Sequence, residues 1–204
     1  MPLKVKVIIG STRPGRFSDK VGKWIADLAK ENQTLDVEVV DLREHPLPFY
    51  DEPGSPSKVA GAYPNPAVQT FAEKIADGDA FIITAAEYNH GPTAVLKNAL
   101  DSIYKEWNQK PVAFVGYGSA GGARAVEQLR EIAVELQMSP ISKAVHIAAP
   151  WLLRDEAGEL KPGALDAYLD SAKAMLEQLS WWGGAFKEAR SGAWSIIDGT
   201  YQRI

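Results

Sequence analysis

Five short apolar stretches, each followed in turn by a helical pattern, constrain the fold of this chain more than any other feature. The stretches are Leu3–Ile9, Leu35–Leu42, Ala80–Ala85, Pro111–Val115 and Ala144–Ala149. Short apolar runs rich in Val and Ile are typical of strands buried on both faces of a parallel sheet. Strands that alternate with helices predict an α/β fold in which helices cover both faces of that sheet.

Apolar residues recur at helical spacing between the strands. We expect Ser18 or Asp19 to cap the first helix. The other helical segments are Pro66–Gly78, a stripe from Leu96 to Ile103, a stripe from Val126 to Leu136, and a last helix over Gly163–Trp182.

The chain has 204 residues, of which 46% are hydrophobic, and this fits one globular domain with a substantial core. We assign residues 1–182 to that domain. Residues 183–204 contain Trp194 and show little periodicity, so we interpret them as a C-terminal tail that packs on the body or on a partner subunit.

Composition argues against several functional classes. The net charge is −4 and the Lys and Arg residues are dispersed, so the chain offers no basic surface for nucleic acid. It has no cysteine, and its three histidines are not at metal-ligand spacing, so we expect no metal site. No apolar run approaches the roughly 18 residues that span a bilayer, and no signal-peptide pattern is present. We therefore expect a cytoplasmic protein that does not enter a membrane.

The segment Arg43–Asn65 has five prolines and no periodicity. Loops of this length are uncommon in compact domains and are often functional. The segment is either a solvated connector or a lid or rim over a site.

Ligands of doubly wound sheets bind outside the carboxyl ends of the strands, where the strand order reverses. We predict the flavodoxin-like order 2-1-3-4-5, in which the first and third strands flank that point. Three loops leave such strand ends: Gly10–Phe17, Glu87–Pro92 and Gly116–Gly122. The first two are the most unusual loops in the chain, and this order makes them neighbours.

The first loop has the composition of a phosphate site. Gly10 allows a sharp turn, Ser11 and Thr12 offer hydroxyls, and the next helix offers free N–H groups. Arg13 and Arg16 add charged donors. The loop matches neither the dinucleotide fingerprint nor the P-loop, so a terminal phosphate dianion suits it better than a pyrophosphate or a nucleoside triphosphate. The alternative is an ordinary turn with surface arginines.

The second loop can contact a planar ring. Tyr88 offers an aromatic face, and Asn89, His90 and Gly91 offer amide and carbonyl groups for the polar edge of a ring such as isoalloxazine. Glu87 is suited equally to orienting the loop or to touching a ligand. His90 could instead cap a helix or face solvent.

The third loop is rich in glycine. Gly118, Gly121 and Gly122 permit close approach of a planar ligand, or only a turn before a helix. Ser119 is equally plausible as the cap of that helix.

These loops carry a resemblance to the NADPH-dependent FMN reductases, a flavodoxin-like family that includes quinone and azo-dye reductases. The matching blocks are Gly10–Arg13, Glu87–His90, Leu96–Asp101, Gly118–Arg124 and Gln128–Arg130. They occur in the family's order and spacing between about residues 3 and 150. The chain departs from the family at Ala86, where a proline is frequent, and at Pro14 and Gly15, which lengthen the first loop.

The resemblance implies where FMN binds. Its phosphate would lie at Ser11, Arg13 and either Arg16 or Ser18. Its isoalloxazine would lie against Glu87–Gly91, with Gly118–Gly122 at the far edge. The resemblance also implies a homodimer or homotetramer in which the helices after the third and fourth strands pack on a second subunit.

The implied activity is an NAD(P)H oxidoreductase. NADPH or NADH would pass a hydride to FMN, and the electrons would then go to a quinone, an azo compound or free flavin. We expect no catalytic side chain and no metal. The alternatives are a flavodoxin-like one-electron carrier, a dinucleotide-binding domain in which Asp41 holds a ribose, and a regulator that has kept only the fold.

Overall fold

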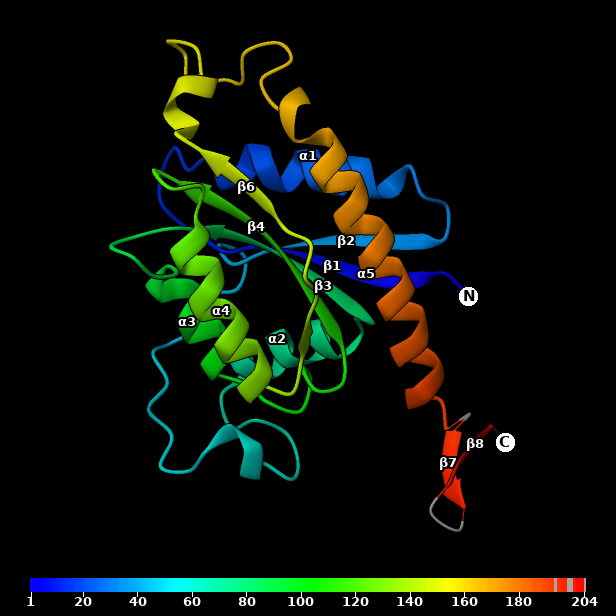
Figure 1. Ribbon diagram of the computed structural model, residues 1–204. Coiled ribbons are helices and arrows are strands. Elements are labelled where there is room, and N and C mark those ends of the chain that lie inside the picture. The colour runs from blue at the N-terminus through cyan, green and yellow to red at the C-terminus, as the bar shows by residue number, and fades with distance from the viewer. Residues whose placement is uncertain (193, 198–199, 204) are drawn as a thin grey trace.

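The computed structural model describes the backbone of residues 1–192, 194–197 and 200–203, and the side chains of residues 1–192. Its centre is one parallel sheet (Figure 1). In spatial order the first four strands are β2 (Leu35–Asp41), β1 (Leu3–Ile9), β3 (Ala80–Ala86) and β4 (Pro111–Gly118). Two further strands, β5 (Ser139–Pro140) and β6 (Val145–Ala148), both pair with β4. The predicted parallel sheet and its order 2-1-3-4-5 are confirmed.

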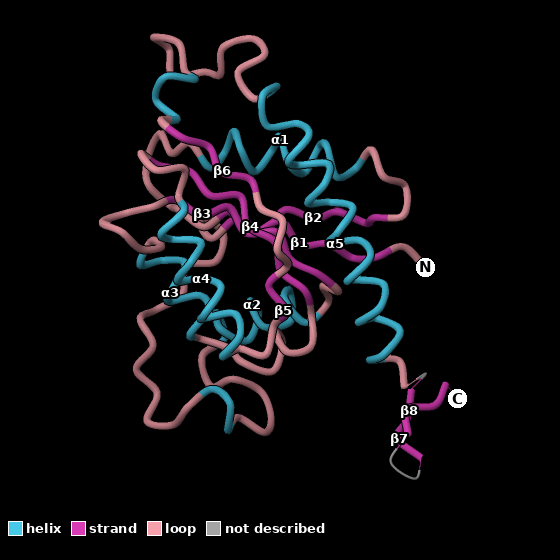
Figure 2. Tube along the Cα trace, viewed as in Figure 1, coloured by secondary structure: helices cyan, strands magenta, loops and turns pink. Residues whose placement is uncertain are grey.

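The fifth position of the sheet is divided between two short strands. β5 pairs with the start of β4 at Pro111, and β6 pairs with its end, from Val115 to Gly118 (Figure 2). Because β6 supplies hydrogen-bond partners there, β4 runs three residues beyond the predicted Val115. Gly116–Gly118 is therefore strand, and the glycine-rich loop begins later than we expected.

Helices cover both faces of the sheet, as predicted (Figures 1 and 2). One face carries α1 (Ser18–Lys30) and α5 (Leu169–Arg190). The other carries α2 (Pro66–Ala76), α3 (Ala94–Asp101) and α4 (Ala123–Glu135). Three short 3₁₀ helices occupy Pro56–Lys58, Pro150–Leu153 and Asp166–Tyr168.

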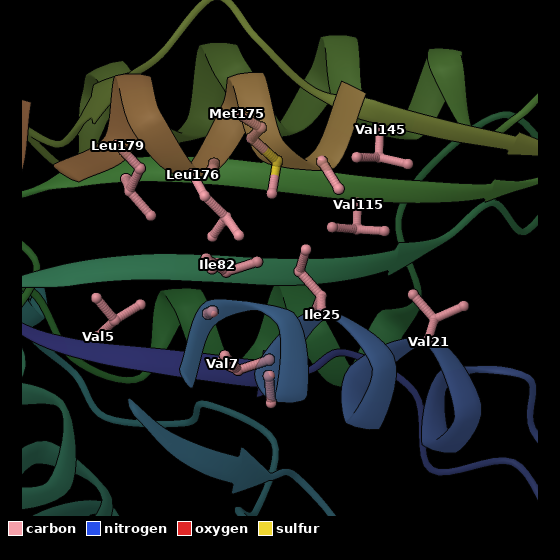
Figure 3. Close-up of a cluster of buried hydrophobic side chains, with 14 of the residues drawn as sticks. Val5, Val7, Val21, Ile25, Ile82, Val115, Val145, Met175, Leu176 and Leu179 are labelled. Carbon is pink, nitrogen blue, oxygen red and sulfur yellow. The ribbon is translucent and has the colours of Figure 1, made fainter. Parts of the chain in front are cut away.

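The first face has a continuous apolar core. Aliphatic side chains of β1, β3, β4 and β6 meet those of α1 and α5, and Figure 3 shows Ile25 and Met175 pointing into this layer from the two helices. Burying a side chain of this size contributes roughly 1.5–3 kcal/mol. The amphipathic stripes of the two helices therefore hold them on the sheet.

The predicted cap of α1 is wrong, and the alternative role of Ser119 as the cap of α4 is excluded. Phe17 occupies the cap position of α1, and Ser18 is the first residue of the helix, with no side-chain capping bond. The cap of α4 is Gly122, not Ser119. Gly122 has φ +71°, and a Cβ there would lie 2.4 Å from the Tyr117 backbone nitrogen, so only glycine fits.

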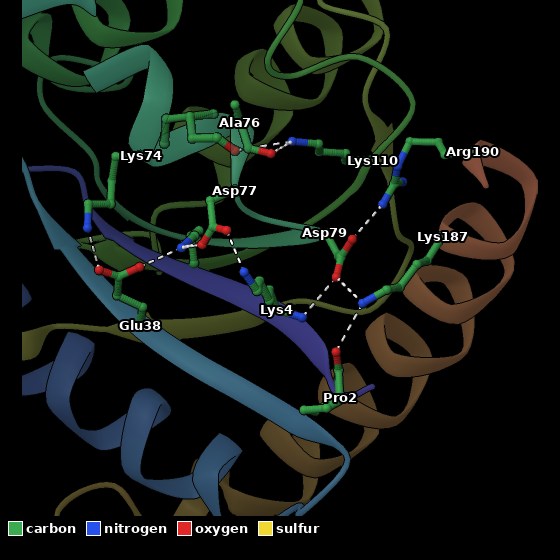
Figure 4. A network of polar contacts seen from close by, with 12 residues as sticks. Pro2, Lys4, Glu38, Lys74, Ala76, Asp77, Asp79, Lys110, Lys187 and Arg190 are labelled. Atoms are coloured by element: carbon green, nitrogen blue, oxygen red, sulfur yellow. Dashed lines mark hydrogen bonds and ion pairs between the residues drawn. The ribbon is translucent and has the colours of Figure 1, made fainter. Parts of the chain in front are cut away.

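The last helix is longer than predicted. α5 ends at Arg190 rather than Trp182, because its final turns are tied to the amino ends of the strands. Asp79 accepts hydrogen bonds from Lys187 Nζ at 2.6 Å and Arg190 Nη2 at 2.9 Å (Figure 4). The first eight residues of the predicted tail thus belong to a helix that contacts the body.

Beyond α5, β7 (Trp194–Ile197) and β8 (Thr200–Arg203) form an antiparallel hairpin, which we did not predict. The side chains of the tail from residue 193 onward lie outside the described residues, and so does the predicted packing of Trp194.

No helix in the described part of the chain is long and apolar enough to cross a membrane. Over the same residues, His, Asp and Glu side chains form no group of three or more that could hold a metal ion.

Candidate functional site

A cavity of about 430 Å³ opens at the carboxyl ends of β1, β3, β4 and β6. The three loops singled out from the sequence all contribute to its wall. The predicted residues that line it are Arg13, Arg16, Glu87, Tyr88, Gly118 and Ser119. Residues we did not predict complete it: Gly15, Phe17, Ala86, Tyr117, Pro150, Trp151 and Arg154.

Gly10 brings the first loop against β3. Its N–H donates to the Thr84 carbonyl at 3.2 Å, and a Cβ at this position would lie 2.4 Å from that oxygen. Only glycine at this position therefore allows the first loop to approach β3 so closely. Next to it, the buried Ser11 Oγ lies 3.2 Å from the Tyr88 hydroxyl, which joins the first two loops.

The two arginines of the first loop have different environments. Arg13 is exposed at the cavity wall. Arg16 is buried, and its guanidinium donates to Asp41 through Nη1 at 2.8 Å and through Nη2, and to Asp19 through Nε at 2.6 Å. Its Nη1 also donates to the Ser11 carbonyl. Arg16 thus holds the loop in shape with a charge already neutralised by two carboxylates.

This pairing shifts both ionisation equilibria. Burial alone would lower the pKa of Arg16 and raise that of Asp41. The hydrogen bonds between them outweigh burial, so the pKa of Arg16 is raised and the pKa of Asp41 is lowered. With its carboxylate held by Arg16 on two sides, Asp41 is not available to hold a ribose, which argues against the dinucleotide-binding alternative.

Two buried hydroxyls lie near the cavity: Tyr117 lines its wall, whereas Ser18 is not among the residues that line it. Ser18 Oγ and Tyr117 OH are both inaccessible to solvent, and no third group of the described residues pairs with either of them. Ser18 interacts with the Tyr117 hydroxyl, which opposes the effect of burial on the pKa of Tyr117. Burial raises the pKa of Tyr117 to about 12, so its hydroxyl keeps its proton and can donate. A buried polar group without a full set of partners is costly, and an oxygen-rich ligand in the cavity would satisfy the Tyr117 hydroxyl.

Arg154 was missed by the sequence analysis. It follows the 3₁₀ helix after β6, donates from Nη1 to the Gly15 carbonyl at 3.1 Å, and stacks 5.0 Å above the Phe17 ring. Its Nε is buried and has no partner. No periodicity or motif marks this segment, so its approach to a loop 139 residues earlier is visible only in the fold.

Residues 88–91 form a two-residue hairpin turn. Tyr88 N–H donates to the Gly91 carbonyl at 2.9 Å, and Gly91 N–H donates to the Tyr88 carbonyl at 3.1 Å. Asn89 and His90 have φ of 49° and 69°, the left-handed conformation that such turns require. The turn presents Tyr88 to the cavity, whereas Asn89, His90 and Gly91 do not line it.

Helix α4 fixes this turn from behind. The buried Glu87 carboxylate accepts from Arg124 Nε at 2.6 Å and from the Arg124 backbone N–H at 3.1 Å. Arg124 Nη1 donates to His90 Nε2 at 2.7 Å, and Gln128 Nε2 donates to the His90 carbonyl at 2.7 Å. Of its two predicted roles, Glu87 has the orienting contacts. His90 caps no helix, since Thr93 is the cap of α3.

The predicted residues of the third loop also fall into two groups, those that line the cavity and those that do not. Gly118 and Ser119 line the cavity. Gly121 packs against His146, and Gly122 caps α4, so both shape the loop from the protein side.

A second cavity of about 400 Å³ lies on the other side of Tyr88. Ser11, Thr12 and Arg13 line it together with Leu47 and Phe49 of the proline-rich segment 43–65. Asn98 of α3 holds that segment in place, donating to the Pro48 carbonyl at 2.8 Å and accepting from Tyr50 N–H at 3.1 Å. The segment therefore forms a rim beside the predicted site.

A smaller, mostly apolar cavity of about 190 Å³ lies under the same segment, against Tyr63 and Val68. It is lined by none of the strand-end loops, so we place the functional site in the 430 Å³ cavity.

The 430 Å³ cavity fits a phosphate monoester attached to a planar ring. At one side it offers Arg13, the Arg154 guanidinium and the Tyr117 hydroxyl, which are all donors for phosphate oxygens. At the other side it offers the Tyr88 ring and the backbone of Gly118 and Ser119. FMN has this combination of groups.

Comparison with known proteins agrees with this geometry. Residues 3–151 match the family described as NADPH-dependent FMN reductase. An NAD(P)H-dependent FMN reductase of Schizosaccharomyces pombe is 39% identical over 135 residues, which are 66% of this chain and 68% of that protein. An NAD(P)H:quinone oxidoreductase of Solanum tuberosum is 34% identical over 146 residues, 69% of this chain and 72% of that protein.

Solved structures show the same fold. FerB, a flavoenzyme NAD(P)H:(acceptor) oxidoreductase from Paracoccus denitrificans, superposes with a TM-score of 0.67 at 21% identity, over 88% of this chain and 98% of that one. A flavodoxin from Pseudomonas aeruginosa superposes with a TM-score of 0.53 at 15% identity, over 86% of this chain and 99% of that one. The family match covers nearly three quarters of the sequence and includes all three strand-end loops. The chain belongs to the NADPH-dependent FMN reductase family.

Proposed function

We propose that this FMN-dependent NAD(P)H oxidoreductase holds FMN in the 430 Å³ cavity and delivers electrons to a quinone, an azo compound or free flavin. The observation that supports the proposal most directly is the pair of buried donors in the cavity wall, Tyr117 OH and Arg154 Nε. The relatives named as reductases favour an enzyme over a flavodoxin-like electron carrier.

The residues of the chain would divide the work of holding the cofactor. Arg13 and Tyr117 would bind the phosphate, while Arg16 keeps the loop in shape through its ion pairs. Tyr88 would contact the ring, and the turn behind it is fixed by Glu87 and Arg124.

Bound FMN supplies the redox chemistry, since its isoalloxazine accepts a hydride from a nicotinamide and yields electrons to an acceptor. The chain would supply orientation and backbone donors. The N–H groups of Tyr88 and Gly91 are used inside their turn, and Asn89 and His90 do not line the cavity, so the donors for the ring would come from the Gly118–Ser119 segment. We assign no side chain as an acid or base, because hydride transfer between two bound rings requires none.

We further propose that the active form is a homodimer or homotetramer. Four large apolar side chains are exposed near the carboxyl end of the sheet, Phe49 and Tyr88 in loops and Trp151 and Leu152 in the 3₁₀ helix Pro150–Leu153. Exposed apolar groups that gather at one site favour an interaction surface. A second subunit that packs there, against α3 and α4, would complete each site.

The test is an absorption spectrum of the purified protein, followed by anaerobic titration with NADPH and then NADH. We expect flavin absorption bands that are bleached by about one equivalent of the nicotinamide and restored by a quinone. A protein that is isolated without flavin and cannot be reconstituted with FMN contradicts the proposal. A one-electron carrier would bind FMN but show no steady-state oxidation of NADPH.

A further inference from the structure

The segment that follows β6 leads back over the phosphate loop. In Figure 1 it continues from the end of β6, beyond the carboxyl end of the sheet and close to the start of α1. Arg154 and Leu160 form a β-bridge within it, and Glu159 makes an ion pair with Lys20 of α1 at 2.5 Å. Lys161 Nζ donates to the Leu152 carbonyl at 3.0 Å. The segment is therefore a built part of the site wall, although most of it lies beyond the family match, which ends at residue 151.

The charges around the cavity are not equally available to a ligand. Arg16 is paired with Asp41 and Asp19. Arg43 is directed to the carbonyls of Thr12 and Arg13 and lies 3.4 Å from Asp19. Among the described residues that line the cavity, Arg13 and Arg154 are the guanidinium groups without a carboxylate partner. A phosphate monoester carries up to two negative charges at neutral pH, and one free arginine leaves part of that charge unbalanced.

We propose that Arg154 is a second guanidinium ligand of the FMN phosphate and supplies the charge that Arg16 cannot. This inference rests on the proposed function of the cavity.

The geometry around Arg154 fits that role. The Phe17 ring supports one face of the guanidinium, and the Gly15 carbonyl accepts from Nη1, so the group is held at the phosphate loop without a counter-charge. The buried Nε has no partner, and a phosphate oxygen would satisfy it together with Tyr117 OH. Phe17 also packs against Tyr117 with ring centroids 5.4 Å apart, which brings the Arg154 guanidinium and the Tyr117 side chain to one aromatic ring.

The experiment compares FMN with riboflavin, which has the same ring and no phosphate. Apoprotein is titrated with each flavin, and binding is followed by quenching of flavin fluorescence, for wild type, Arg154→Gln, Arg154→Lys and Lys161→Gln. The last variant is the matched control, because it removes a cation and a tether of the same segment without touching the cavity.

We expect Arg154→Gln to weaken FMN binding roughly 10- to 100-fold, as for the loss of a charge-assisted hydrogen bond, and to change riboflavin binding less than about twofold. Arg154→Lys should recover part of the loss, and Lys161→Gln should resemble wild type. Equal weakening of both flavins by Arg154→Gln would mean that Arg154 only supports the loop, and this overturns the inference. Unchanged FMN binding in that variant overturns it as well. If wild-type protein binds neither flavin, the proposed function itself fails, which is a different result.

Discussion

The guanidinium of Arg16 donates hydrogen bonds to both carboxylate oxygens of Asp41, at the carboxyl ends of the neighbouring strands β1 and β2. Arg16 comes from the phosphate loop, and Asp41 is the last residue of β2. The side chain of Arg16 is only 2% exposed and that of Asp41 is 19% exposed. The pair therefore fixes the phosphate loop to the sheet from a largely buried position.

Replacing Arg16 with Met should be strongly destabilising, because it leaves the Asp41 charge buried without its partner. The expected loss of unfolding free energy is about 3 kcal/mol, measured by urea denaturation. Asp41→Asn should cost less, since Arg16 keeps its contact with Asp19. A double variant, Arg16→Met with Asp41→Asn, should be more stable than the sum of the single losses predicts. Additive losses would contradict a direct coupling of the two residues.

The same pair predicts that the unfolding free energy depends on pH in the acid range. The pKa of Asp41 is lowered in the folded protein, because the hydrogen bond from Arg16 outweighs the opposing effect of burial. Its contribution to stability is therefore present above its ordinary pKa and is lost as the pH falls through the lowered value. The difference in unfolding free energy between wild type and Asp41→Asn should be constant from pH 5 to 7 and shrink below about pH 4. A difference that does not change with acid would contradict this assignment.

Arg124 should stabilise the turn that carries Tyr88. The side chain of Glu87 is 3% exposed, and its pKa is lowered because hydrogen bonds from Arg124 outweigh the effect of burial. Arg124→Met leaves that carboxylate unpaired, and we expect a loss of about 3 kcal/mol in unfolding free energy together with weaker FMN binding. Glu127→Gln, on an exposed position of the same helix, is the control and should change neither quantity. Normal stability of Arg124→Met would show that the pair does not hold the turn.

Tyr88 should act through its ring more than through its hydroxyl. It lines the cavities of about 430 and 400 Å³, and its hydroxyl forms a hydrogen bond of 3.2 Å with Ser11. Tyr88→Phe should change the dissociation constant of FMN by less than about threefold, whereas Tyr88→Leu should weaken binding by roughly tenfold as the aromatic contact is lost. Fluorescence titration with FMN measures both. If Tyr88→Phe weakened FMN binding more than Tyr88→Leu, the hydroxyl of Tyr88 would matter more than its ring.

Lys110 predicts a stability change at alkaline pH. Its Nζ is buried at the end of α2, where it donates to the carbonyls of Ile75 at 3.1 Å and Ala76 at 3.0 Å (Figure 4). Burial, with a smaller contribution from Arg190, lowers its pKa to about 8. The unfolded chain then binds more protons than the folded chain between about pH 8 and the ordinary value of 10.5, so stability rises with pH in that window.

Lys110→Met removes this titration. The stability of wild type relative to the variant should increase by roughly 3 kcal/mol from pH 7.5 to 10.5, measured by denaturant unfolding at each pH. A relative stability that stays flat over this range would show that Lys110 keeps an ordinary pKa.

The sequence by itself determined the sheet, its strand order and the loops that form the site. Buried parallel strands consist of Val and Ile runs that local composition reveals, and the loops at their carboxyl ends meet because of connection rules that hold for the whole class. For this reason Arg13, Tyr88 and Gly118 could be placed at one cavity from the chain alone.

Only the tertiary structure decided which polar groups remain available in that cavity. Arg13 and Arg16 have the same chemistry in the sequence, but packing brings Asp41 and Asp19 to Arg16 and leaves Arg13 at the wall. Arg154 has no sequence signal, because its relation to Gly15 depends on how the chain returns after β6. Charge pairing and desolvation depend on distances between residues far apart in the chain, and a local pattern does not contain those distances.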